Sequence, residues 1–173
     1  MLVFGLDTKH IKLTFFSLED TMDIGSGKGF PESDLSNFHP HWFIFDGVEC
    51  ESMEGLLQSF KFDKPHIQVE VCRLTGLAAK FRGKKRNKAW KRCQTLWWKG
   101  EPFARQGPEF QELLNRAFEA LSTNDGFKKA LLATGNSALT HSLGKSKPTE
   151  TVLTEREFCS RLEKIREKIR KEK

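Results

Sequence analysis

The sequence predicts one α+β domain that is rich in helices and carries a short β-hairpin and strand region near its N-terminus. The chain of 173 residues is long enough for a single domain with a sizeable core. An Asp-Gly pair joins two short β-prone runs in the first third of the chain. Apolar residues recur at helical spacing through most of the remainder. We therefore expect residues 1–173 to fold as one unit.

The N-terminal part predicts a strand followed by a loop. Ile11, Leu13 and Phe15 alternate with polar residues, as in a half-buried strand. We expect residues 14–34 to form a flexible, glycine-rich loop with residues 25–29 at its tip. Its glycines let backbone amides approach an anion, and Lys28 adds a positive charge. The spacing is not that of a P-loop, so a plain surface loop and a loop that covers a substrate both remain open, with Lys28 as a candidate substrate contact.

A hairpin and a helix follow. Residues 42–45 and 48–50 are joined by Asp46-Gly47, a turn in which both residues take positive φ angles. After the hairpin the apolar period changes to i, i+3, i+4, i+7, which predicts one face of a helix. The residues of this face are Met53, Leu56, Leu57 and Phe60. Ser52 stands where it can cap the helix start.

The later elements are mostly helices. Apolar spacing after Lys64-Pro65 predicts one helix up to Gly83, and Pro108 opens a core helix that runs to Leu121. A short helix is expected over residues 127–133. Thr154 and Glu157 form a capping box for the last helix. Residues 170–173 should form a frayed tail.

Composition restricts the function classes. The net charge of +6 favours an anionic partner, such as a nucleotide or a nucleic acid. The four cysteines are widely separated, without a C-x-x-C pair or a histidine at ligand spacing, so no metal is expected. We interpret them as reduced thiols of a cytoplasmic protein. No apolar run approaches the ~20 residues that span a bilayer, and no secretion leader is recognisable.

Residues 80–92 form the most basic run, with eight lysines and arginines and no acid. Such residues neutralise phosphates, and neighbouring tryptophans stack on bases. A solvated basic helix is an equally weighted alternative. The candidate phosphate contacts are Lys84, Lys85 and Arg86. Trp90 and Trp97 are seven residues apart and share one helical face, whereas Trp98 falls off this face and is the candidate aromatic platform.

A polar stripe lies beside the apolar face of the helix that starts after Ser52. Glu54, Gln58 and Lys61 are spaced i, i+4 and i+7, so they share one flank of the helix. A carboxylate at a helix start, with an amide and an ammonium beside it, is a candidate catalytic group. Spacing alone favours the alternative of a solvated flank.

This segment resembles the NADAR family (NAD- and ADP-ribose-associated). The family pattern is LSNF, a D-G turn, and then a T-V-E-H-x-x-Q-x-x-K-F helix; here the chain reads LSNF at 35–38, the turn at 46–47, and S-M-E-G-x-x-Q-x-x-K-F at 52–62. A looser likeness covers residues 118–139. The family histidine after the glutamate is Gly55 here, the R-x-D-W block is not clear near Arg105, and the late D-x-x-W-G and G-x-N-x-L-G elements are absent around residues 140–148.

The resemblance implies a helix-rich α+β fold and cleavage of an N-glycosidic bond next to a ribose phosphate, without a metal or redox cofactor. Family substrates include ADP-ribose attached to guanine in nucleic acid and riboflavin-pathway intermediates. We expect an N-glycosidase that acts on an ADP-ribosyl or ribose-phosphate adduct, with ADP-ribosylated guanine in DNA or RNA as the first choice. One alternative is a module that binds ADP-ribose or modified nucleic acid without cleaving it, and another is an N-glycosidase of riboflavin-pathway intermediates. A third is a plain nucleic-acid-binding protein that uses residues 80–92.

Each predicted role follows from this chemistry. Breaking a ribosyl C1′–N bond builds positive charge on the sugar, and a carboxylate stabilises that charge or activates water, so Glu54 is the predicted catalytic residue. By resemblance, Asn37 would bind ribose hydroxyls, and Gln58 and Lys61 would orient Glu54 or contact phosphate. Phe38 would stack or pack beneath Asn37. For both Phe38 and Lys61, a purely structural role is equally open. Ser36, from the same LSNF segment, completes the predicted substrate site.

Overall fold

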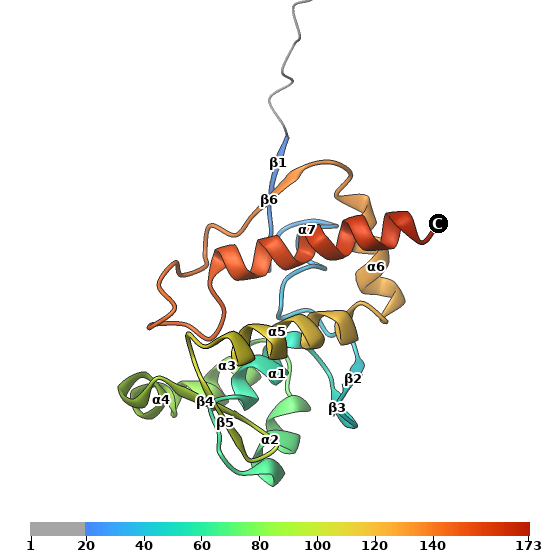
Figure 1. Cartoon of the computed structure of the whole chain (residues 1–173). Helices are drawn as coiled ribbons and strands as arrows, with labels where there is room; N and C mark the ends of the chain where they lie inside the picture. The colour runs from blue at the N-terminus through green and yellow to red at the C-terminus, as the bar shows by residue number, and fades with distance from the viewer. Residues whose placement is uncertain (1–19) are drawn as a thin grey trace, which may run out of the picture.

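The computed structural model describes residues 20–173. The strand predicted around residues 11–15, and the part of the predicted loop before residue 20, lie outside the described residues. The described part is an α+β fold rich in helices, which confirms the predicted fold class (Figure 1). Its strands are β1 (Thr21–Asp23), β2 (Phe43–Phe45), β3 (Val48–Cys50), β4 (Thr95–Trp98), β5 (Glu101–Ala104) and β6 (Ala138–Thr140). Its helices are α1 (Met53–Ser59), α2 (Pro65–Cys72), α3 (Gly76–Lys84), α4 (Asn87–Cys93), α5 (Pro108–Leu121), α6 (Asp125–Ala133) and α7 (Glu155–Lys171).

Helix α5 lies at the centre of the fold, between α7 on one side and α1–α3 with β4–β5 on the other (Figure 1). Its apolar face is fully buried, as its helical spacing predicts. The ring of Phe110 lies 6.1 Å from that of Phe60, just after α1, and the ring of Phe118 lies 6.0 Å from that of Phe158 on α7. Aromatic pairs on both sides of α5 therefore join the two halves of one core.

The β2–β3 hairpin forms as the sequence predicts. Phe43 pairs with Cys50 and Phe45 with Val48, and both turn residues, Asp46 and Gly47, take positive φ angles of 47° and 79°. The helix predicted after the hairpin is also confirmed, as α1. Ser52 caps its start as expected, since its hydroxyl accepts a hydrogen bond from the Gly55 amide at 3.0 Å.

The prediction of one helix from Pro65 to Gly83 is wrong. The chain forms α2 and α3, which are separated by residues 73–75, and Gly76 begins α3 with a φ of 50°. Carbonyl groups at the end of α2 bind the start of α1 instead of continuing a helix. Leu74 O accepts from the Ser52 hydroxyl at 2.9 Å, and Cys72 O accepts from the Glu51 amide at 2.9 Å. Tertiary contacts thus override a continuous helical pattern.

Trp98 is not an exposed stacking platform, and this prediction is wrong too. The chain leaves α4 at Gln94, which has a φ of 52°, and continues as strand β4. The side-chain period therefore becomes 2, which buries Leu96 and Trp98 together. Trp98 is 4% exposed, stacks on Phe45 at a centroid distance of 5.3 Å, and donates from Nε1 to Asp46 at 2.8 Å.

One strand lies where a loop was expected. Strand β1, inside the segment 14–34 predicted as a loop, pairs in parallel with β6, so Thr21 lies opposite Ala138. Three-residue strands contain too few residues to show a period of 2 in the sequence. The Thr154–Glu157 capping box of α7 is present as predicted, and α7 continues to Lys171, into the segment expected to fray. Helix α6 begins at Asp125, before the predicted residue 127, because Asn124 caps it.

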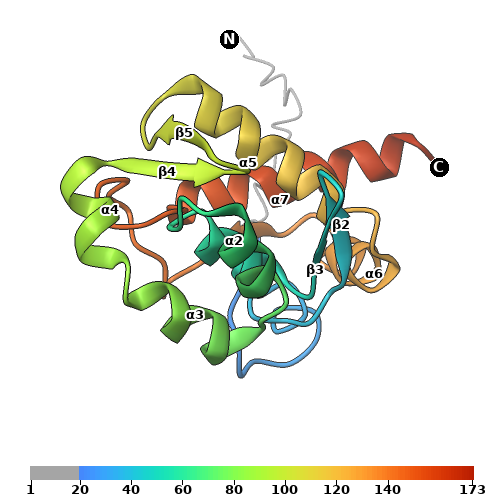
Figure 2. The same ribbon diagram turned by 90° about the horizontal axis from the view of Figure 1, so that it is seen from below.

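Helices α3 and α4 form a continuous arc along one edge of the molecule (Figure 2). They carry the basic run of residues 80–92 on that edge. None of the helices in residues 20–173 combines the length and the apolar character needed to cross a membrane.

Gly55 allows α1 to lie directly on the α2–α3 connection. A Cβ atom at this position would lie 2.6 Å from Leu74 O and 3.0 Å from both Cys72 O and Val71 O. These atoms belong to the backbone, so they cannot turn away as a side chain would. The same contact explains why the family histidine is absent at position 55, since no side chain fits there.

We predict that Gly55→Ala destabilises the protein by about 1–3 kcal/mol, the usual range for overpacking, although alanine favours helices over glycine. Chemical denaturation of the two proteins measures this difference. Gly29→Ala is the control, because a Cβ there meets nothing within 4 Å. An unchanged or increased stability of Gly55→Ala would show that the helices do not approach as closely as described.

Candidate active site

A cavity of about 750 Å³ lies against α1, α3 and the start of α4. Its size is that of sites for small molecules and cofactors. The cavity brings together most of the residues that the sequence analysis selected. Those that line it are Ser36, Asn37, Phe38, Glu54, Gln58, Lys61 and Lys84.

The LSNF segment and helix α1 are fastened to each other at the cavity. The Glu54 amide, at the start of α1, donates to Asn37 O at 2.9 Å, which occupies one of the free amides of the first turn. The Ser36 hydroxyl accepts from the Phe38 amide at 3.2 Å and so shapes the turn of this segment. The main chain of the segment therefore fixes where Asn37 and Glu54 lie relative to each other.

Glu54 is held by a neighbouring amide on its own helix. Gln58 Nε2 donates to Glu54 Oε1 at 2.8 Å, one turn further along α1. Burial raises the pKa of the Glu54 carboxyl. The hydrogen bond from Gln58 and the positive charges of Lys61, Lys80 and His141 act in the opposite direction, without cancelling the effect of burial.

Gln58 occupies space that only a glycine on α3 leaves free. A Cβ atom at Gly83 would overlap Gln58 Oε1 and lie 2.7 Å from its Cδ. Gln58 is buried, and its Oε1 has no hydrogen-bond partner within residues 20–173. Gly83 therefore allows α3 to approach α1, and this approach confines the side chain that orients Glu54.

Lys61 is a buried cation at the same cavity. Its Nζ donates to Asn87 Oδ1 at 2.7 Å, and Asn87 also accepts from Trp90 Nε1 at 3.2 Å. Burial lowers the pKa of Lys61 to about 8, which the negative charge of Glu54 opposes. The charges of Lys91, Lys145 and Lys80 lower it further. Lys61 therefore loses its charge at a lower pH than a surface lysine does.

Besides Trp98, three predicted contacts lie away from the cavity lining. Lys28 is exposed and forms an ion pair with Asp23, although Gly25 and Ser26 of the same loop do line the cavity. Lys85 is exposed on the outer side. Arg86 donates from Nε to Lys61 O at 3.3 Å, so it supports the chain at Lys61. Lys84 is thus the one member of the predicted basic trio that reaches the cavity.

Other cavity residues were not selected from the sequence as site residues. They are Lys80, Asn87, His141 and Lys145, among others. His141 Nδ1 lies 2.7 Å from Ile24 O, and since a carbonyl can only accept, Nδ1 carries the hydrogen. Lys80 belongs to the basic run, which was the available signal for it. Lys145 is brought in by the chain after β6, and no local pattern marks it.

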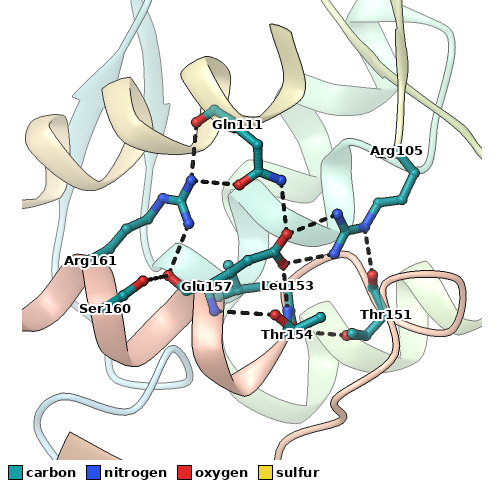
Figure 3. A network of polar contacts seen from close by, with 8 residues as sticks. All are labelled: Arg105, Gln111, Thr151, Leu153, Thr154, Glu157, Ser160 and Arg161. Atoms are coloured by element: carbon teal, nitrogen blue, oxygen red, sulfur yellow. Dashed lines mark hydrogen bonds and ion pairs between the residues drawn. The ribbon is translucent and has the colours of Figure 1, made fainter. Parts of the chain in front are cut away.

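A buried ion pair holds another wall of the cavity (Figure 3). Arg105 is 1% exposed and donates to both carboxylate oxygens of Glu157, at 3.1 and 2.8 Å, and to Thr151 O at 2.8 Å. Glu157 also accepts from Gln111 at 2.8 Å and from the Thr154 amide at 2.7 Å. The network fastens residues 150–153, which line the cavity, to the residue after β5, to α5 and to α7.

Residues 29–167 match the family described as Bacteriophage protein GP30.3. The chain belongs to this family of phage proteins. A relative, the uncharacterised 17.1 kDa protein of the Gp30–rIII intergenic region of Enterobacteria phage T4, is 37% identical over 150 residues. This match covers 86% of the chain and 98% of the relative.

The GP30.3 fold is similar to the NMR structure of the Escherichia coli protein YbiA, with a TM-score of 0.61. The likeness covers 93% of this chain and 91% of YbiA, at 16% sequence identity. At this identity the likeness shows the fold. The helix-rich α+β fold that the resemblance of the LSNF and Glu54 segments implies is therefore confirmed.

Within the described residues of this GP30.3 protein, no group of three or more histidine, cysteine, aspartate or glutamate side chains is placed to hold a metal ion. The cavity instead combines the half-buried carboxylate of Glu54 with amide, ammonium and imidazole groups. This set is suited to binding phosphates and to stabilising a positive charge on a sugar.

We predict that Glu54→Gln raises the melting temperature at pH 7 by a few degrees. A folded-state pKa above the unfolded value means that the ionised carboxylate costs stability at neutral pH, and glutamine can still accept from Gln58. The gain should shrink as the pH falls and the wild-type carboxyl takes up a proton. Thermal melts of both proteins from pH 4 to pH 7.5 test this, and a variant less stable than wild type at pH 7 would contradict a desolvated Glu54.

Proposed function

We propose that this GP30.3 protein is a hydrolase that cleaves the ribosyl C1′–N bond of an ADP-ribosyl adduct, with guanine of a nucleic acid as the leaving base. The observation that carries the proposal is the position of Glu54, a desolvated carboxylate oriented by Gln58 beside several cations of one cavity. The resemblance to NADAR proteins supports the same reaction class.

The proposed chemistry uses the charge of Glu54. As the C1′–N bond breaks, its electron pair leaves with the base and positive charge develops on the ribose. The ionised carboxylate stabilises this charge. A water oxygen then bonds to C1′ and one of the water protons passes to Glu54. Return of this proton to the departing base completes the hydrolysis and leaves Glu54 ionised again. Because Gln58 holds Oε1 at 2.8 Å, the other carboxylate oxygen is available to the substrate.

The remaining cations are suited to the phosphates of the substrate. Lys80, Lys84 and Lys145 line the cavity, and within residues 20–173 none of them forms an ion pair. Ammonium groups bind phosphate oxygens as compact charges. We assign the Asn37 side chain and the Ser36 region to the ribose hydroxyls, and Lys61 to charge balance beside Glu54.

The basic arc of α3 and α4 supports a nucleic acid as the carrier of the adduct (Figure 2). It continues outward from the cavity, where Lys84 lies at the lining and Lys85 and Lys88 are exposed. Exposed cations without acidic neighbours bind the phosphate backbone and release counterions. This role suits the predicted phosphate contact at Lys85, although that residue does not line the cavity.

A module that binds the adduct without cleaving it is the second candidate. The observation that favours it is the absence of the late family elements near residues 140–148. The loss of the family histidine at position 55 is weaker support. A Cβ atom at Gly55 would lie 2.6 Å from Leu74 O, so the packing of α1 already accounts for the glycine. His141 meanwhile supplies an imidazole to the cavity lining.

We predict that Glu54→Gln lowers turnover roughly 10²–10⁴-fold, the usual contribution of a positioned acid–base group, without unfolding the protein. Guanine-ADP-ribosylated DNA, NAD and an early riboflavin-pathway intermediate are incubated with each protein, and products are identified by mass spectrometry. Glu51→Gln is the matched control, an exposed neighbour that does not line the cavity. Full activity of Glu54→Gln would exclude the assigned role, and no product from any adduct with wild type would favour the binding module.

We expect the turnover rate to depend on pH through the charges of Glu54 and Lys61. Turnover is expected to rise with pH as Glu54 ionises, at a pH above that of an ordinary glutamate, and to fall above about pH 8 as Lys61 loses its proton. Lys61→Arg keeps the positive charge at high pH, so the alkaline fall in kcat/KM should disappear even if the rate is lower. If kcat/KM of Lys61→Arg still falls at alkaline pH, the fall is caused by a group other than Lys61.

A further inference from the structure

The imidazole ring of His141 is fixed in position at the cavity. His141 directly follows β6, and Ile24 directly follows the paired strand β1 (Figure 1). Nδ1 donates to Ile24 O at 2.7 Å. The ring packs edge-on against Phe158, at a centroid distance of 5.2 Å and an interplanar angle of 82°. A Cβ atom at Gly144 would lie 2.6 Å from His141 Cδ2, so a side chain there would displace the ring.

The second ring nitrogen, Nε2, is accessible. Nε2 has no hydrogen-bond partner among residues 20–173, and it is not one of the buried unpaired polar atoms of that part of the chain. The residue itself lines the cavity. Because Ile24 O can only accept, Nδ1 keeps its hydrogen, and Nε2 is the atom that gains and loses a proton. The cavity therefore contains one positioned imidazole nitrogen that can carry a proton.

His141 and Glu54 act on each other although they come from distant segments. The positive charge of His141 lowers the pKa of Glu54 and so favours its ionised form, against the effect of burial. A carboxylate and an imidazole that share one cavity can divide the work of bond cleavage, one acting on the sugar and the other on the leaving group.

The proposed reaction needs a proton donor for the departing base. A purine leaves poorly as an anion and much faster when it takes up a proton. Glu54 acts as an ionised carboxylate, so it cannot supply this proton at the moment of cleavage. Lys61 Nζ is held by Asn87 Oδ1 at 2.7 Å, and the other three lysines of the lining are assigned to phosphates. Glu150 also lines the cavity, but it is exposed.

We propose that His141 is a second catalytic residue, the general acid that protonates the departing base. As the C1′–N bond breaks, its electron pair leaves with the base, and the proton on Nε2 passes to the base. A water oxygen bonds to C1′, and one water proton passes to Glu54. Transfer of that proton from Glu54 to Nε2, directly or through water, restores both residues. One water is consumed, with its hydroxyl on the ribose and one hydrogen on the base. The inference rests on the proposed function for the reaction itself.

Two leaving groups test the role of His141. Guanine-ADP-ribosylated DNA carries a base that must be protonated, whereas the 4-nitrophenolate of 4-nitrophenyl ADP-ribose departs without a proton. His141→Asn keeps an amide donor for Ile24 O but has no Nε2. We expect this variant to lower kcat/KM roughly 10²–10⁴-fold for the guanine adduct and less than about threefold for the nitrophenyl substrate. A merely structural role would lower both alike.

His66→Asn is the matched control, because His66 is exposed and lies outside the lining. It should leave both rates unchanged, and so should Glu150→Gln. Glu54→Gln should slow both substrates, since each builds positive charge on the ribose. Circular dichroism checks that every variant is folded, and His141→Gln takes the place of His141→Asn if the latter is not.

Equal loss on the two substrates, or no loss on the guanine adduct, would overturn the role of His141 and leave the hydrolase standing. A wild type that cleaves the guanine adduct but not the nitrophenyl substrate would also overturn it, because Glu54 should then suffice for a leaving group that needs no acid. Absence of turnover of either substrate by wild type would contradict the proposed function itself.

Discussion

The close approach of α1 to α2 and α3 is the constraint on which the site depends. Gly55 lets α1 lie on the carbonyl groups that end α2, and Gly83 leaves room for Gln58 between α1 and α3. Gln58 in turn holds Glu54 at 2.8 Å. One helix of seven residues is therefore clamped on two sides by backbone, and its free flank forms part of the cavity. A catalytic group needs this kind of fixed support.

The site carries a stability cost that the surrounding structure offsets. Glu54 and Lys61 are both desolvated, which shifts the pKa of each toward its neutral form, and Gln58 Oε1 lacks a hydrogen-bond partner among residues 20–173. The wall formed by residues 150–153 is in contrast held by the ion pair of Arg105 with Glu157, in which Arg105 also binds Thr151 O. The shifted pKa values of Glu54 and Lys61 thus lie together at one cavity, as expected of functional sites.

Local signals predicted the elements that they determine. The Asp46-Gly47 turn, the Ser52 cap and the Thr154 capping box each fix a few residues by their own chemistry, and all three are present. The predictions fail where contacts between distant segments determine the local structure. The α2–α3 break depends on carbonyl groups that bind α1, and the burial of Trp98 depends on a change from helix to strand. Glu54, Gln58 and Lys61 were found from the spacing of one segment, although Lys61 lies just after α1. The LSNF segment was found by resemblance, and Lys84 by the basic run. Lys145 has no such local pattern.

A crystal structure of the Glu54→Gln variant with an ADP-ribosylated guanine nucleotide tests the central claim most directly, since the slow variant retains its substrate. The account predicts that the ribose C1′ lies beside residue 54, with the diphosphate along Lys80, Lys84 and Lys145. A ligand bound outside the cavity, or one whose C1′ lies far from residue 54 while a phosphate occupies that place, would contradict the assignment of Glu54 as the catalytic residue.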